Sequence, residues 1–284
     1  MSSIPSLSPN PITDIRALFT FPFMVNAIEA GTIVAVLAAI VGWYVVLRRQ
    51  AFASHTLSVM AFPGAAGAAL AGLPIALGYY LACTIAALAI GRAGRGERRG
   101  RAGESAAIGT VQTVGLAAGF LFLSLDHALL GEPDSLLFGT FLGITRGQVL
   151  GLLGVALGSL AAVAVLGRPL LFSSIDREVA RAGGVPVGLL DALFLLILAL
   201  AIAATSQLTG ALLVFALLVA PAATAQQITL RPLLGLTLTI AFGLGIVWLG
   251  LAIAYFSIYP IGFYVTTLAF GLYVVTRAVR AVRG

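Results

Sequence analysis

Long uninterrupted runs of apolar residues limit what this chain can fold into more than any other feature. Nine such runs, separated by segments that contain Arg, Gly or Pro, lie at about 24–47, 54–73, 74–91, 105–125, 147–166, 186–205, 208–225, 233–254 and 262–280. A helix of about 20 apolar residues crosses a hydrocarbon core of roughly 30 Å. The sequence therefore predicts an all-α polytopic membrane protein, with a single transmembrane domain over 24–284 after a tail or surface segment at 1–23. If residues 12–23 form an amphipathic surface segment, eight spans with the N-terminus inside are the competing count.

The composition excludes the main alternatives to a helical membrane protein. Hydrophobic residues make up 60% of the 284 residues and charged residues 9%, whereas a soluble domain carries roughly 25% charged residues. The single cysteine, Cys83, excludes a disulfide scaffold, and a membrane β-barrel would show short alternating strands instead of continuous apolar runs. All 16 basic residues are arginine. Without a lysine the chain cannot form the Walker A phosphate loop, so ATP hydrolysis is expected in a separate chain.

The arginine distribution predicts how the chain is oriented. With the N-terminus outside, fourteen arginines lie on the cytoplasmic side and two, Arg16 and Arg146, lie outside. An excess of Lys and Arg marks the cytoplasmic side of a membrane protein, so we expect the C-terminus inside. The tract GRAGRGERRGRAGE at 91–104 is interpreted as a flexible cytoplasmic loop near anionic headgroups, and no nucleic-acid partner is expected.

Glycines recur every four residues on several predicted spans. The repeats are Gly115 and Gly119, then Gly143, Gly147 and Gly151, and then Gly154 and Gly158. Small residues at this spacing let membrane helices approach closely, where lipid provides no hydrophobic drive for association. We therefore expect a tightly packed bundle; helix contacts that move during a transport cycle are the alternative.

The segment RPLLFSSIDREVARAGGVP at 168–186 is unlike a simple connecting loop. It presents the features of a short capped helix in order: a cap at Ser173 or Ser174, acidic Asp176 and Glu178 in the first turn, Arg181 in the last turn, and the terminators Gly183, Gly184 and Pro186. Acidic residues favour the start of a helix and basic residues its end. We expect a rigid helix at about 173–184 against which a partner can push.

A second pattern is LLVAPAATA at 217–225. Pro221 removes a backbone hydrogen bond inside a predicted span and is followed by small residues and Thr224. This pattern predicts a kink in the helix. The kink is either a structural feature only or a hinge that moves during function.

A third pattern is RRQAFASHTLSVMAFPG at 48–64, which brings polar residues into a span. His55 and Ser58 lie near its start, and Pro63 with Gly64 is expected to break the helix. Ionisable side chains at membrane depth usually face a pathway or a partner. For His55 an interfacial or capping role is the alternative.

In their order and spacing, these segments resemble the permease subunits of ATP-binding-cassette importers for zinc, manganese and related metal ions. The coupling segment of that family reads F-D-x-E-x-A-R-A-x-G-I, and residues 175–185 follow it almost throughout. The late motif L-L-V-x-P-A-A-T-A is matched at 217–225. With VLRR at 46–49 and LLFG at 136–139, the likeness extends from about residue 21 to about residue 279.

The resemblance implies an inner- or plasma-membrane homodimer with the fold of the metal and vitamin importer permeases and a path along its two-fold axis. Two ATP-binding-cassette subunits would dock on the coupling helices, and an extracytoplasmic metal-binding protein would deliver the ion. It implies transport of a divalent metal, zinc or manganese, with no permanently bound cofactor. The ATPase-coupling residues would be Asp176, Arg177, Glu178, Arg181 and Gly184, and the pathway residues His55, Ser58, Pro63, Pro221 and Thr224.

One departure from the family concerns the metal. The family's early motif G-D-A-L-S-H-A-x-x-P-G carries an Asp and a His four residues apart, on one helix face, where both can ligate a metal. Aligned on the Pro-Gly pair at 63–64, this chain has His55 for the Asp, Val59 for the His and Ser54 for the first Gly. His55 is then the candidate metal ligand, and imidazole suits zinc and other late divalent ions.

A stand-alone secondary transporter of a cation or small solute is the alternative function. It would need intramembrane carboxylates for coupling, and Glu29 and Asp191, both near predicted span ends, are the candidates. A purely structural subunit would leave the segment at 173–184 unexplained. The outer-loop residues Asp126, His127, Glu132 and Asp134 fit solvated loop chemistry better than metal reception.

Overall fold

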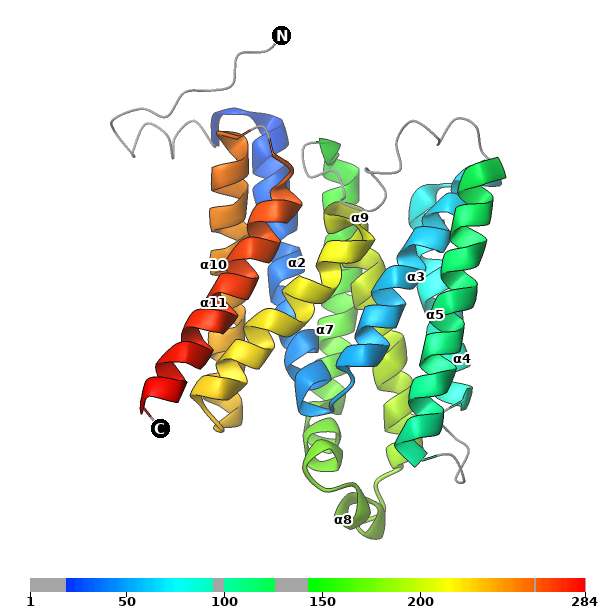
Figure 1. The fold of residues 1–284 in the computed structure, drawn as a ribbon, viewed down its shortest axis with the longest axis vertical. Coiled ribbons are helices and arrows are strands. Elements are labelled where there is room, and N and C mark those ends of the chain that lie inside the picture. Colours follow the sequence, from blue (N-terminus) through cyan, green and yellow to red (C-terminus); the bar gives the residue numbers. More distant parts are fainter. Residues whose placement is uncertain (1–18, 94–99, 126–142, 258, 284) are drawn as a thin grey trace.

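Helices account for every regular element in the described chain, which comprises residues 19–93, 100–125, 143–257 and 259–283 of a computed structural model. They run in the order α2 (Pro22–Leu47), α3 (Ala51–Leu70), α4 (Ile75–Ala93), α5 (Gly100–Leu125), α7 (Arg146–Ile175), α8 (Arg177–Ala182), α9 (Val187–Ile228), α10 (Pro232–Tyr255) and α11 (Ile261–Arg283) (Figure 1). Seven helical segments of this described part are long and apolar enough to cross a membrane. The predicted all-α polytopic fold is confirmed.

The longest element, α9, is two helices joined at a sharp reversal. At Gly210 the backbone has φ 73° and ψ 165°, a conformation essentially confined to glycine. The first half leads away from α8, and the second half returns to end beside the start of α10 (Figure 1). With the halves taken separately and the short helix α8 set aside, the described helices correspond one to one with the nine apolar runs of the sequence.

Helix α3 is the most enclosed of the shorter helices. It packs against α4, α5 and α9, and the polar residues 54–56 and 58 occupy its first half. Thr56 donates a hydrogen bond to Gln112 of α5 (2.9 Å), and the Cys83 thiol of α4 donates to the Leu57 carbonyl (3.4 Å). Buried polar groups of this kind are accepted in a membrane only where protein encloses and pairs them.

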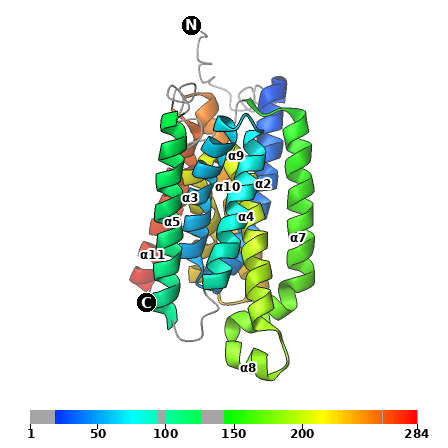
Figure 2. The ribbon, with the colours of Figure 1, turned by 90° about the vertical axis from the view of Figure 1, so that its right-hand side faces the viewer.

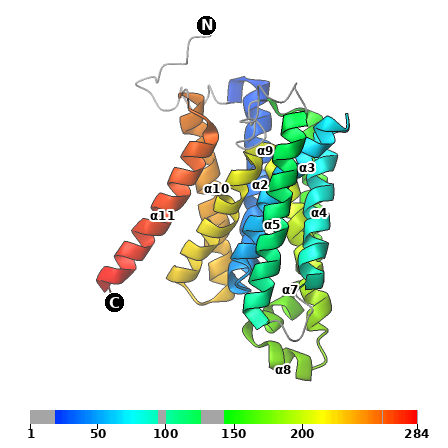
Figure 3. The same ribbon diagram turned by 45° about the vertical axis from the view of Figure 1, so that its right-hand side comes forward.

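The remaining helices surround α2 and α9, which pack closely against each other. Figure 2 shows α7 standing along one edge of the molecule with α8 below it, and Figure 3 shows α11 leaning away from the other helices. The C-terminal end of α11 lies toward the same end of the bundle as α8, whereas α2 begins at the opposite end (Figure 1).

Glycine spacing predicts close packing correctly on α5 but not on α7. A Cβ at Gly115 would lie 2.1 Å from the Met60 sulfur, and one at Gly119 would lie 2.7 Å from the Phe62 ring, so α5 rests on α3. A Cβ at any of Gly143, Gly147, Gly151, Gly154 or Gly158 meets no described atom within 4 Å. The prediction is therefore wrong for contacts between α7 and the other helices of the same chain, because these glycines point out of the bundle.

Candidate functional site

The short helix α8 lies at the tip of the bundle between α7 and α9. Asp176 is its N-cap, and the Asp176 carboxylate accepts hydrogen bonds from the backbone N–H groups of Glu178 (2.9 Å) and Val179 (3.0 Å). The predicted cap at Ser173 or Ser174 is wrong, because α7 continues to Ile175. Both serine hydroxyls donate back to the Leu170 carbonyl in the last turn of α7.

Most of α8 faces outward. Its six residues are exposed except Ala180, which is fully buried, and the hydrophobic side chain of Val179 is 53% exposed. The helix ends at Gly183, and Gly184 follows with φ 81° before α9 begins. Asp176, Arg177, Glu178 and Arg181 therefore form a charged, capped and accessible surface, and Gly184 provides the left-handed turn behind it.

A carboxylate at the start of α9 joins three elements. Asp191 accepts hydrogen bonds from Arg177 of α8 through one oxygen and from Arg48, just after α2, through the other. Its own side chain is 23% exposed, whereas that of Arg48 is 4% exposed. Asp191 is thus the shared partner of one accessible arginine and one buried arginine.

Arg48 is held from several sides. It donates to the Leu170 carbonyl (3.4 Å), to Ser173 (3.2 Å) and to Ser174 (3.2 Å), and its guanidinium lies 5.2 Å from the centre of the Phe194 ring. Burial lowers the pKa of Arg48, and the Asp191 carboxylate opposes that shift. An arginine enclosed in this way stays charged, because its ordinary pKa is so high, and it needs the carboxylate beside it.

Three residues, 48–50, connect α2 to α3 in a tight turn. Arg49 has φ 57°, in the left-handed region, and Gln50 N–H donates to the Val45 carbonyl (2.9 Å) while Arg49 N–H donates to the Val46 carbonyl (3.1 Å). This is the helix-ending arrangement that usually carries glycine. A residue with a Cβ in the left-handed region costs about 1–2 kcal/mol, so the turn is held by its surroundings.

His55 lies in the first turns of α3 and is half-buried. Its ring meets the edge of Phe215, in the second half of α9, at 5.0 Å between centroids. The Nδ1 atom is buried and has no hydrogen-bond partner among the described residues. Ser58 is 1% exposed and donates to the His55 carbonyl (2.7 Å), so its hydroxyl is engaged within its own helix.

The expected break in α3 is absent from the described structure. The helix continues through Pro63 to Leu70, and Pro63 is buried between neighbouring helices. A Cβ at Gly64 would lie 2.3 Å from the Gly78 carbonyl oxygen of α4, so this pair brings two backbones into contact. Enclosure by α4 and α5 lets the helix accept the missing hydrogen bond at the proline.

The segment 217–225 packs the second half of α9 against α2. A Cβ at Gly42 would lie 1.9 Å from the Leu218 carbonyl oxygen, and Gln226 donates to the Trp43 carbonyl (3.1 Å). Thr224 is fully buried and donates to the Ala220 carbonyl (2.7 Å). Pro221, where a kink is predicted, lies inside the helical second half of α9, and the helical backbone is interrupted at Gly210, where only glycine is suited to the required dihedral angles.

The titratable groups do not form a metal cluster within one copy of the described chain. No group of three or more His, Cys, Asp or Glu side chains gathers in the described ranges. Glu29 pairs with Arg146 at the end of the bundle opposite α8, and Asp191 pairs with Arg48 and Arg177. The two carboxylates considered for a secondary transporter are therefore both neutralised by arginine. The outer-loop residues 126–134 lie outside the described residues.

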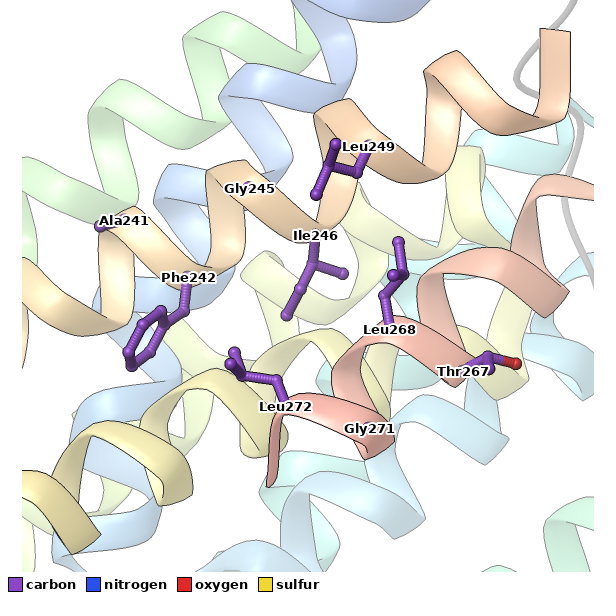
Figure 4. Close-up of a pocket in the computed structure, with 9 residues that line it drawn as sticks. All are labelled: Ala241, Phe242, Gly245, Ile246, Leu249, Thr267, Leu268, Gly271 and Leu272. Atoms are coloured by element: carbon purple, nitrogen blue, oxygen red, sulfur yellow. The ribbon is translucent and has the colours of Figure 1, made fainter. Parts of the chain in front are cut away.

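An apolar cavity of about 420 Å³ opens between α10 and α11 (Figure 4). Ala241, Phe242, Gly245, Ile246, Leu249, Thr267, Leu268, Gly271 and Leu272 line it. None of these side chains carries a charge or a metal-ligating group, so this cavity offers nothing to a cation.

Sequence reasoning missed Arg48 and the true role of Asp191. The sequence presents Arg48 as a topology signal and as part of VLRR at 46–49, and Asp191 as a candidate for ion coupling. Their separation by 143 positions in the chain hides the contact. The available signal was an acidic residue near a span end in a chain with few carboxylates, because such a residue needs a partner.

Comparisons with known proteins agree on one family and one fold. Residues 20–280 match the ABC 3 transport family. The manganese transport system membrane protein MntC of Halalkalibacterium halodurans is 31% identical over 80% of this chain and 76% of that protein. The chelated iron transport system membrane protein YfeC of Yersinia pestis is 32% identical over 85% of this chain and 80% of that protein. PsaBC from Streptococcus pneumoniae, solved in complex with Fab, superposes with a TM-score of 0.82 at 25% identity, covering 94% of this chain and 95% of that chain.

Proposed function

The chain belongs to the ABC 3 transport family, and we propose that it is the membrane permease subunit of an ATP-binding-cassette importer for a divalent transition-metal ion. Helix α8 carries this conclusion: it is short, capped, charged and exposed at one end of an apolar bundle. A chain without lysine cannot build its own phosphate loop. The energy must come from ATPase subunits, and α8 is a surface on which such a subunit can dock.

Manganese or iron is the proposed cargo, supported by the relatives described for manganese and for chelated iron. His55 contributes a buried ring nitrogen that no described group uses. Zinc remains compatible with an imidazole ligand, but none of the relatives reported above is described as a zinc transporter. His55 supplies one metal ligand in each chain. A site with two imidazole ligands would therefore need the His55 side chain of a second copy of the chain.

A homodimer with a path along its two-fold axis suits these features. The outward glycine face of α7 meets no described atom of its own chain, and small residues at this spacing let membrane helices pack closely. An extracytoplasmic binding protein would deliver the ion at the end opposite α8. Neutralisation of Glu29 and Asp191 by arginine counts against the secondary-transport alternative.

Metal uptake coupled to ATP tests this function. The permease would be expressed with the ATPase and the binding protein of its transport system, and uptake of radioactive manganese and iron would be measured with and without ATP. Replacing Arg181, which is exposed on α8, by Glu should abolish ATP-driven uptake while leaving the permease inserted, because a charge reversal disrupts a partner interface more than a packed bundle. Undiminished ATP-driven uptake in Arg181→Glu would contradict the assignment of α8 as the docking helix.

A further inference from the structure

Resting on the proposed function, we propose that Asp191 is a positioning residue that transmits movement of α8 to the start of α3. Its carboxylate joins the accessible Arg177 to the buried Arg48. These contacts link the surface where an ATPase subunit would push with the helix that carries His55, although the two are far apart along the chain.

The first step of this linkage is the attachment of α8. At its N-terminal end Arg177 is paired with Asp191, whereas its C-terminal end leads into Gly183 and Gly184, the latter with φ 81°. The paired end is therefore fixed to the bundle by charge, whereas the hydrogen bonds at the glycine end, from Gly183 N–H to Val179 (2.9 Å) and from Val185 N–H to Ala180 (3.0 Å), stay within the segment itself. A force on α8 is carried into the bundle through Arg177.

The second step is the buried pair of Asp191 and Arg48. The Arg48 side chain is 4% exposed and makes further hydrogen bonds to the last turn of α7, to Ser173 and to Ser174. A buried arginine cannot leave its carboxylate without leaving an uncompensated charge in a low-dielectric site. Displacement of Asp191 therefore displaces Arg48 with it.

The third step is the turn from Arg48 into α3. Residues 48–50 are the whole connection, and the hydrogen bonds from Gln50 N–H to Val45 and from Ser54 N–H to Gln50 (3.0 Å) hold it between the two helices. A connection of three residues held by these backbone hydrogen bonds has little freedom to change its length. Movement of Arg48 is passed to the first turns of α3, where His55 faces Phe215.

Asp191 could have a purely structural role, which is to neutralise Arg48, instead of transmitting movement from α8. A substitution at Arg177 distinguishes these two roles. The Arg177 side chain is 55% exposed. Arg177→Gln therefore removes the ion pair that links Asp191 to α8 and leaves the buried pair of Arg48 and Asp191 intact. If Asp191 serves only to neutralise Arg48, losing Arg177 has no effect on coupling.

The experiment measures manganese transported per ATP hydrolysed in proteoliposomes that contain the permease, its ATPase and its binding protein. With ATPase binding measured in parallel and variants compared at equal binding, we expect Arg177→Gln to lower this ratio about two- to fivefold, as suits a half-exposed ion pair. The matched control is Glu29→Gln, which removes the Arg146 pair at the other end of the bundle and should leave the ratio unchanged.

Two further variants determine which contact is responsible. At matched amounts of folded permease, Asp191→Asn should lower the ratio further, and the double variant Arg177→Gln/Asp191→Asn should equal Asp191→Asn alone, because both changes act on one contact. Additive losses would mean that Arg177 acts on the ATPase and not through Asp191, and would overturn the inference. An unchanged ratio in Arg177→Gln would overturn it as well. Absence of ATP-driven uptake in the unmodified protein would instead refute the proposed function.

Discussion

His55 combines three properties at the scale of a single residue. It lies in the first turns of a helix enclosed by other helices, its ring contacts a different element through Phe215, and its Nδ1 is buried without a partner in the described chain. A buried polar atom without a partner costs roughly 1–3 kcal/mol. Such a cost is tolerated where the atom has a function. An imidazole nitrogen can ligate a metal ion during transport, which would be such a function.

Replacing His55 by Ala should therefore reduce metal uptake strongly without lowering the amount of folded permease in the membrane. His55→Asp should restore part of the uptake, because a carboxylate also ligates manganese and iron. The control is Ser54→Ala, since Ser54 is buried and donates only to the Ala51 carbonyl of its own turn (2.8 Å). Equal uptake of radioactive manganese by His55→Ala and the unmodified protein, at matched expression, would show that the histidine has a local structural role.

The residue scale is also where the sequence is least informative. Local patterns identify Asp176 and Glu178 at the start of a short helix, because capping depends on neighbours in the chain. They assign the cap to the wrong residue, since both serines can cap but the structure uses them to hold Arg48. The partners of Asp191 come from elements distant in sequence, so no local pattern predicts them.

At the scale of elements, the apolar runs predict each crossing helix, because a bilayer fixes the length of apolar helix that it accepts. The special residues were harder to interpret. Pro63 suggests a break and Pro221 a kink, but the helix continues through Pro63, and the reversal in α9 occurs at Gly210. Whether a proline interrupts a membrane helix depends on the neighbours that enclose it, and these are set by the tertiary fold.

The contact between α3 and α4 gives a prediction at this scale. A Cβ at Gly64 would lie 2.3 Å from a backbone oxygen of Gly78, and backbone has little room to move. We expect Gly64→Ala to destabilise the permease by about 1–3 kcal/mol, measured as a lower Tm of the purified protein in detergent. Gly109→Ala on α5 is the control, because a Cβ there meets no described atom within 4 Å. Equal Tm values for both variants would mean that α3 and α4 are not in backbone contact.

At the scale of the whole molecule, the position of α8 and the arginine imbalance agree. The C-terminal end of α11 lies toward the end of the bundle that carries α8 (Figure 1), which is also the end to which the arginine count assigns the cytoplasm. A docking helix for ATPase subunits has to face that compartment.

Labelling with an impermeant thiol reagent in intact cells checks this orientation. Single cysteines would be introduced into a Cys83→Ser background, in which the buried native thiol is removed. Cysteines in the loop at 92–101 and at Ala278 should be protected, and those at Leu129 and Ser257 should react, because the arginine distribution predicts only the latter pair on the outer side. Permeabilised cells, in which all four should react, are the control. Labelling of the 92–101 loop from outside would reverse the orientation and remove α8 from the reach of ATPases.

The reversal at Gly210 also bears on how the protein enters its membrane. After Gly210 the returning half of α9 runs to Ile228, and at 1.5 Å per residue it reaches about 27 Å of a hydrocarbon core of roughly 30 Å. A returning half of this length barely spans the core. It therefore suits insertion together with the first half, as a hairpin closed at Gly210.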